Sequence, residues 1–137
     1  MMSTPLLCLL FFALWTVALV LFVIGAYRVG EILTGQRRID SFPADQAHEG
    51  PGWYQRALRA HLNCVENLPV FGAVVLVGEL SGGASSLAEL LAPVYLGARV
   101  LQTLTHICSV SPAAITLRFI FFVIQLGCFL AMSWALL

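Results

Sequence analysis

The chain has 137 residues, of which 60% are hydrophobic and 10% are charged, and its formal net charge at pH 7 is zero. A mean hydropathy of +0.92 lies far above the range of soluble domains. The balanced charge, without a long basic run, argues against nucleic acid as a partner. We therefore expect an integral membrane protein of one domain, residues 1–137, with room for about four spans of roughly 20 residues.

The first expected helix covers about residues 6–32 and carries no charged residue between Leu6 and Tyr27. This stretch is long enough to cross the hydrocarbon core of a bilayer. A cleaved signal peptide would begin with basic residues, and the opening MMSTPLLC has none. We expect the helix to be retained as the first span.

One long connection, about residues 34–55, follows this helix and is rich in glycine, proline and charge. All seven basic residues of the chain are arginines, and five of them flank or occupy this loop: Arg28, Arg37, Arg38, Arg56 and Arg59. By the positive-inside rule the loop faces the cytoplasm. With four spans, both termini then lie on the opposite side of the membrane.

Three further helices are expected at about residues 54–80, 87–108 and 113–137. Short turns, SGGASS and SVSP, separate them. Because these turns are short, consecutive helices should be antiparallel neighbours. The expected fold class is an all-α membrane protein, built as a bundle of four transmembrane helices.

The cysteines and histidines give no sign of a metal site. Cys8, Cys64, Cys108 and Cys128 lie in or beside the expected spans without CxxC spacing, so we interpret them as small apolar packing residues. The histidines, His48, His61 and His106, are scattered over a loop and two helices without a paired-ligand pattern. We expect no bound metal.

Polar side chains inside the expected spans are the most informative feature of the sequence. An ionisable group in hydrocarbon costs several kcal/mol unless it is paired or hydrated, so we expect these residues to face the interior and to line a cavity that opens to the cytoplasm. They recur at helical spacing: Arg59, Asn63 and Glu66 on the second helix, Arg99, Gln102, Thr103 and His106 on the third, and Arg118 on the fourth.

The charges on these faces do not balance, because Arg59, Arg99 and Arg118 face a single carboxylate, Glu66. If the polar residues served only to hold the helices together, they would account for one ion pair. The surplus of positive charge favours a bound anionic ligand. The planar guanidinium fork of arginine is suited to carboxylates.

The segment RALRAHLNCVENLPVF resembles the signature of the MAPEG family, the membrane-associated proteins in eicosanoid and glutathione metabolism. The matching positions are Arg59, Asn63, Glu66, Pro69 and Phe71. The arginine in YLGARVLQTLTH and the length of the chain agree with the family, so the resemblance covers essentially the whole chain. It implies a homotrimer of four-helix subunits that bind glutathione between neighbours near the cytosolic face.

The resemblance also implies roles for individual residues. Glutathione would be bound by Arg59, Asn63, Glu66, Arg99, Gln102 and Arg38, and the catalytic residues would be Arg118 and His106. The chain departs from the family pattern at two of these positions. His106 replaces a tyrosine of the eicosanoid enzymes, and Arg118 lies about a turn beyond the usual thiol-activating arginine, near Ala114 or Ile115.

The function expected on this basis is that of a membrane-bound glutathione transferase or peroxidase. Glutathione would be the cosubstrate, and its arginine-stabilised thiolate would attack a lipophilic electrophile or reduce a lipid hydroperoxide. The first alternative is a non-enzymatic relative that binds a lipid or glutathione. A small four-helix exporter is less consistent with the sequence, because the first span lacks an acidic residue.

Overall fold

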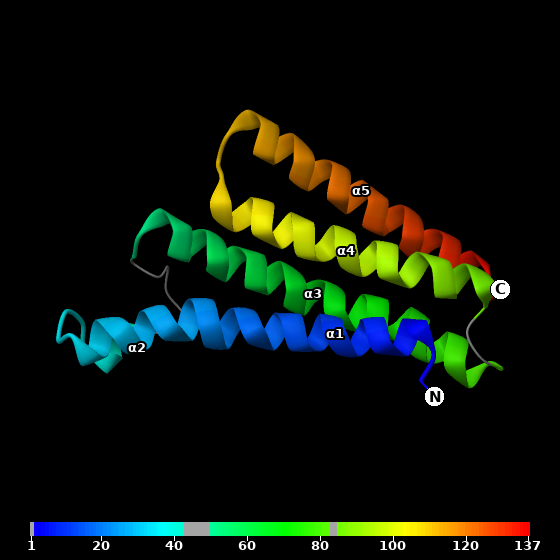
Figure 1. Cartoon of the computed structure of the whole chain (residues 1–137), viewed down its shortest axis with the longest axis horizontal. Coiled ribbons are helices and arrows are strands. Elements are labelled where there is room, and N and C mark those ends of the chain that lie inside the picture. The colour runs from blue at the N-terminus through cyan, green and yellow to red at the C-terminus, as the bar shows by residue number, and fades with distance from the viewer. Residues whose placement is uncertain (1, 43–49, 83–84) are drawn as a thin grey trace.

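Every regular element in the computed structural model is a helix (Figure 1), and the structure describes residues 2–42, 50–82 and 85–137. The expectation of an all-α protein is confirmed. The elements in chain order are α1 (Thr4–Ala18), the π-helix η1 (Leu19–Gly25), α2 (Ala26–Leu33), the short 3-10 helix η2 (Ile39–Ser41), α3 (Gly52–Leu80), α4 (Ser86–Cys108) and α5 (Pro112–Trp134).

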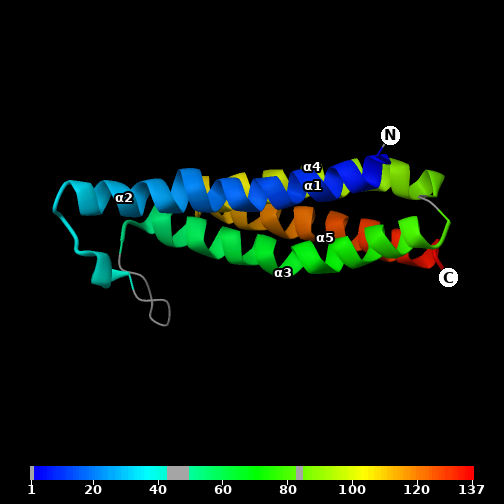
Figure 2. The same cartoon turned by 90° about the horizontal axis from the view of Figure 1, so that it is seen from below.

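The long helices form rods that lie alongside one another (Figures 1 and 2). The elements α1, η1 and α2 join into one rod, Thr4–Leu33. Both termini lie at one end of the bundle, and the loop after α2 lies at the other, which we call the loop end (Figure 1). Helix α1 packs on α3 and α4, whereas α5 packs mainly on α4 and touches α3 little.

Local chemistry sets where the helices begin. The hydroxyl oxygens of Ser3, Ser85 and Ser111 accept backbone N–H groups in the first turns of α1, α4 and α5. These bonds satisfy donors that have no partner within the helix. Pro112 occupies the first position of α5, where the missing N–H of proline is not needed.

An aromatic cluster holds α1, α3 and α4 together. The rings of Phe71 and Tyr95 stack with their centroids 4.3 Å apart. The ring of Phe12 lies 6.2 Å from that of Phe71 and 6.3 Å from that of Tyr95. The small buried residues Cys64 and Ala92 let the three helices approach closely around these rings.

Among the described residues, three rods are long and apolar enough to cross a membrane: Thr4–Leu33, Gly52–Leu80 and Pro112–Trp134. Their outward side chains include exposed Phe22 and Phe119, as expected of a surface that lipid covers. Helix α4 has 23 residues, but its polar side chains keep it out of this group.

Gly25, at the end of the π-helical turn, allows a close approach of backbone atoms. A Cβ atom at this position would lie 2.7 Å from the carbonyl oxygen of Val20, whereas one at Gly30 in α2 would have no neighbour within 4 Å. We expect Gly25→Ala to lower the free energy of unfolding in detergent by about 1–3 kcal/mol. The matched control, Gly30→Ala, should keep or raise it by up to about 1 kcal/mol, because alanine favours helix. Equal stability of the two variants would show that the π-turn does not depend on Gly25.

Candidate functional site

The polar face of α3 points away from the rest of the helical bundle. Arg59 and Glu66 are exposed and Asn63 is half-buried, whereas Ala60 and Cys64, on the other side of the helix, are buried. The expectation that this face lies inside the bundle is wrong for a single subunit. The physical reason is that the small side chains of α3 give α1 and α4 the closer approach.

Arg99 lies inside the bundle and not on the same surface as Arg59. Its side chain is 2% exposed, and its guanidinium carbon lies 5.8 Å from the centroid of the Phe12 ring. Within the described part of the chain, Nε and Nη2 of Arg99 have no hydrogen-bond partner. The structure therefore does not bring Arg99 together with the polar face of α3.

Three arginines lie near the half-buried His106 at the loop end. The half-buried imidazole of His106 on α4 lies within the electrostatic influence of Arg118 on α5 and of Arg59 and Arg56 on α3. We call these four residues the cationic cluster. It includes residues of α3, α4 and α5.

Two polar contacts position the cluster. The Arg56 Nε donates to the carbonyl oxygen of Ile107 at 2.9 Å, which satisfies an acceptor in the last turn of α4. The Gln102 Nε2 donates to the carbonyl oxygen of Arg118 at 2.9 Å, and this bond ties α4 to α5 beside the Arg118 side chain. Gln102 thus supports the cluster through the backbone of α5.

No carboxylate among the described residues pairs with the arginines of the cluster. In the ranges 2–42, 50–82 and 85–137, no ion pair is formed by Arg59, Arg118 or Glu66. Glu66 is therefore not the salt-bridge partner that a purely structural role would require. The charges of the two arginines and of Glu66 remain available to a ligand.

Arg38 lies apart from the cluster in this subunit. It follows α2, is exposed, and its Nε lies 3.4 Å from a carboxylate oxygen of Asp40. His48, which the sequence analysis assigned to the loop, is outside the described residues. Thr103 and Cys64 pack inside the bundle, with their Oγ1 and Sγ atoms 3.5 Å apart.

Sequence reasoning did not select two residues that contribute to the site, Arg56 and Gln125. Gln125 is 2% exposed, and its Nε2 donates to Oε1 of Gln102 at 3.1 Å. The sequence could have pointed to Gln125, because it is the one amide in the apolar stretch FIFFVIQLGCFL and lies seven residues after Arg118. Seven residues are two helical turns, so both side chains share a face.

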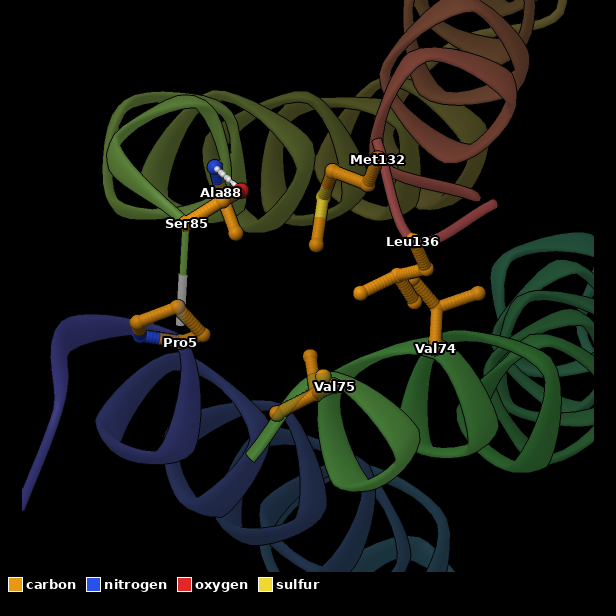
Figure 3. Close-up of a pocket in the computed structure, with 8 residues that line it drawn as sticks. Pro5, Val74, Val75, Ser85, Ala88, Met132 and Leu136 are labelled. Atoms are coloured by element: carbon orange, nitrogen blue, oxygen red, sulfur yellow. Dashed lines mark hydrogen bonds between the residues drawn. The ribbon is translucent and has the colours of Figure 1, made fainter. Parts of the chain in front are cut away.

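One small cavity, far from the cationic cluster, offers little chemistry. An apolar cavity of about 10 Å³ lies at the end of the bundle that holds the termini, lined by residues such as Pro5, Val75 and Met132 (Figure 3). It has room for at most one water molecule, and the hydroxyl of Ser85 is already bonded to the N–H of Ala88. Among the described residues, no group of three or more His, Cys, Asp or Glu side chains could hold a metal ion.

Comparison with known families identifies the same family that the α3 segment RALRAHLNCVENLPVF resembles. The model of the MAPEG family matches residues 5–137, a range that includes α3, α4, α5, the cationic cluster and all but the first residue of the rod Thr4–Leu33. Comparison with curated proteins gives no match.

Proposed function

Because the chain belongs to the MAPEG family, we propose that it is a membrane-bound enzyme that uses glutathione as cosubstrate. The observation that carries this proposal is the cationic cluster, together with Glu66, which lies on the α3 face that also carries Arg59 and has no ion-pair partner among the described residues. Glutathione carries two carboxylates, one ammonium group and a thiol. Arginines suit the carboxylates and Glu66 suits the ammonium group.

We assign the residues by the groups that they present. Arg59 and Arg56 would bind carboxylates, Asn63 would hydrogen-bond the peptide, and Glu66 would accept the ammonium group. Arg118, supported by Gln102, would face the thiol, with His106 beside it. We place Arg99 outside this cradle because the bundle encloses it, and Arg38 would reach the cradle only from a neighbouring subunit.

The chemistry follows from the thiolate. A free thiol has a pKa of about 8.5, and a guanidinium in a poorly hydrated site favours the charged form. In conjugation, the thiolate forms a carbon–sulfur bond and the displaced electron pair leaves with the leaving group. In peroxide reduction, the thiolate takes the terminal oxygen and releases an alkoxide, which gains a proton. A second glutathione then converts the sulfenic acid to disulfide and water.

The exposed polar face of α3 supports assembly and topology. Charged side chains facing lipid cost several kcal/mol each, so a second copy should cover Arg59 and Glu66. We propose a homotrimer, as in the family, in which α4 also spans the membrane, the loop end faces the cytoplasm and both termini face the opposite side. A lipophilic second substrate would arrive from the bilayer.

The assembly can be measured directly. We expect native mass spectrometry in mild detergent to give a trimer, because the bilayer cannot solvate the polar face of α3. A monomer that still binds glutathione with full affinity would contradict a site shared between subunits.

A second prediction concerns Glu66 and glutathione affinity. We expect Glu66→Gln to weaken glutathione binding about tenfold, because it removes a charged acceptor, with little change in stability. The matched control is Glu79→Gln on the same helix, since Glu79 accepts a hydrogen bond from Ser3 at the other end of the bundle and should not affect affinity. Calorimetry and thermal unfolding measure both quantities. A loss of stability with unchanged affinity would make Glu66 structural.

One titration tests the function itself. Adding glutathione to the purified protein should produce ultraviolet thiolate absorbance near neutral pH, and turnover with a lipophilic electrophile or hydroperoxide should follow. Glutathione binding without thiolate formation would instead favour the non-enzymatic relative. The observation that favours this non-enzymatic function is that Arg118 lies about one turn beyond the usual position of the family's thiol-activating arginine.

A further inference from the structure

Two amide side chains link α4 to α5 beside the cationic cluster. The Gln102 Nε2 donates to the carbonyl oxygen of Arg118 at 2.9 Å, and the Gln102 Oε1 accepts from Nε2 of Gln125 at 3.1 Å. The Gln125 Nε2 also donates to the carbonyl oxygen of Phe121 at 2.8 Å. Gln102 therefore bonds α5 at the backbone of Arg118 and at a side chain seven residues later. We call Gln102 and Gln125 the amide pair.

The donors and acceptors of these bonds fit together in one arrangement. A backbone carbonyl oxygen can only accept, so Gln125 must turn its nitrogen toward Phe121. Gln102 must then present its oxygen to that nitrogen, which leaves its own nitrogen for the carbonyl of Arg118. Turning the Gln102 amide over would set two donors against each other at Gln125 and two acceptors against each other at Arg118. Gln125 thus determines which end of Gln102 faces Arg118.

Stability does not account for the amide of Gln125. Its Oε1 is buried and has no hydrogen-bond partner among the described residues, and a buried acceptor without a donor destabilises the folded state. The side chain borders a cavity of about 120 Å³, whose other walls include Phe122 and Phe129, so an apolar side chain of the same length has room. Where an apolar replacement is tolerated, the best attested use of a buried polar residue is to fix the register of neighbouring helices.

The register of α5 decides where Arg118 lies. Helix α5 packs mainly on α4 and touches α3 little, and the axes of α4 and α5 diverge toward the loop end (Figure 1). A hydrogen bond weakens steeply when its angle departs from linearity. The bond from Gln102 to the Arg118 backbone therefore constrains both the height and the rotation of α5 at this residue.

We propose that the amide pair positions Arg118, so that its guanidinium meets the thiol of glutathione. The inference rests on the proposed function and adds Gln125 as a positioning residue that acts through Gln102 and Arg118. Without the amide of Gln125, Gln102 would be free to turn over, and its bond to the α5 backbone would be lost part of the time. Arg118 would then spend less time at the thiol, and the thiolate would be less favoured.

Gln125→Met tests this inference in the full-length protein in detergent, because methionine keeps an unbranched side chain and removes the amide. The fraction of bound glutathione that is thiolate at pH 7 should fall about three- to tenfold, as the pKa of its thiol rises. Glutathione affinity should change less than about twofold, because the amide pair does not touch the tripeptide. Thiolate absorbance against pH and calorimetry measure the two quantities, and Gln125→Leu serves if the methionine variant does not fold.

The melting temperature separates positioning from a purely structural role. It should stay the same or rise in Gln125→Met, since the unpaired oxygen is lost. The control variant Cys128→Ala removes buried atoms three residues further along α5 and leaves both amides in place. It should lower the melting temperature and leave the thiol pKa unchanged. A Gln125→Met variant that behaves like Cys128→Ala would overturn the inference.

Combining Gln125→Met with Arg118→Leu separates this inference from the proposed function. If the amide pair acts through Arg118, adding Gln125→Met to protein that already lacks the guanidinium should change the thiolate fraction less than about twofold. An equal effect in both backgrounds would reject the positioning role and leave the role of Arg118 intact. If wild-type protein binds glutathione without forming thiolate, or if Arg118→Leu does not change the thiol pKa, the proposed function fails and the positioning role fails with it.

Discussion

Replacing Arg118 by leucine is expected to raise the pKa of the bound glutathione thiol toward its free value of about 8.5 and to cut turnover at pH 7 about ten- to a hundredfold. Arg118 is half-buried on α5, and its charge acts on His106 across the helix interface. Within the described residues no carboxylate pairs with it. This is why we propose the glutathione thiolate as the anion that Arg118 binds.

The sign of the pH dependence follows from the loss of the positive charge. Without the guanidinium the thiolate is less favoured, so activity should require a higher pH. Glutathione affinity should fall much less, because Arg59, Asn63 and Glu66 are proposed to bind the rest of the tripeptide. Thiolate absorbance against pH gives the pKa of the bound thiol, and calorimetry gives the affinity.

Thr116→Val is a suitable control on the same turn of α5. Its hydroxyl bonds the carbonyl oxygen of Pro112, so we expect no change in the thiol pKa. If Arg118→Leu abolishes affinity and leaves the thiol pKa unchanged, Arg118 binds a carboxylate. If neither quantity changes, Arg118 extends toward the membrane interface and the non-enzymatic function is favoured.

Much of the fold could be predicted because its causes are local. Long apolar runs indicated helices that cross a membrane, and Pro112 indicated the start of α5. The π-helix could not be predicted, since residues 19–25 read LVLFVIG and differ from an ordinary apolar helix only in the final glycine. The close approach of the Val20 carbonyl oxygen to Gly25 is a backbone feature that hydropathy does not record.

The candidate site was harder to predict, because a polar face that avoids lipid can turn toward its own bundle or toward another subunit. Helical spacing correctly placed Arg59, Asn63 and Glu66 on one face of α3. The direction of that face depends on Ala60 and Cys64, which pack inward. Small residues on the side of α3 opposite the charged face could have indicated that the charged face points away from the bundle.

Arg99 shows the same limit on α4. Its spacing with Gln102 and His106 suggested a shared cavity, yet it lies on the inner side of α4 against Phe12. Sequence spacing shows on which side of its own helix a residue lies. The packing of α1 against α4 decides which side of α4 is buried. The convergence of His106 with Arg118 depends equally on how α5 packs on α4.

We expect Arg99→Met to raise the free energy of unfolding by about 1–4 kcal/mol and to change glutathione affinity less than about twofold. Removing a guanidinium from water costs several kcal/mol, and each unpaired N–H adds about 1–3 kcal/mol. The cation–π contact with the Phe12 ring stabilises the folded state by about 2 kcal/mol at most. Methionine keeps an unbranched apolar stem in the same space, so the lost charge should dominate the result.

Arg59→Met provides the contrasting variant, because Arg59 is exposed on α3 and belongs to the proposed glutathione cradle. It should lower affinity about tenfold or more, from the loss of a charged hydrogen-bond donor, and should leave the stability of the subunit nearly unchanged. Denaturant unfolding in detergent and calorimetry measure both variants side by side. If Arg99→Met instead lowers affinity as much as Arg59→Met does, a glutathione carboxylate must reach the interior of the bundle. The unpaired Nε and Nη2 of Arg99 would then be its binding groups, and α1 would have to move from α4 to admit it.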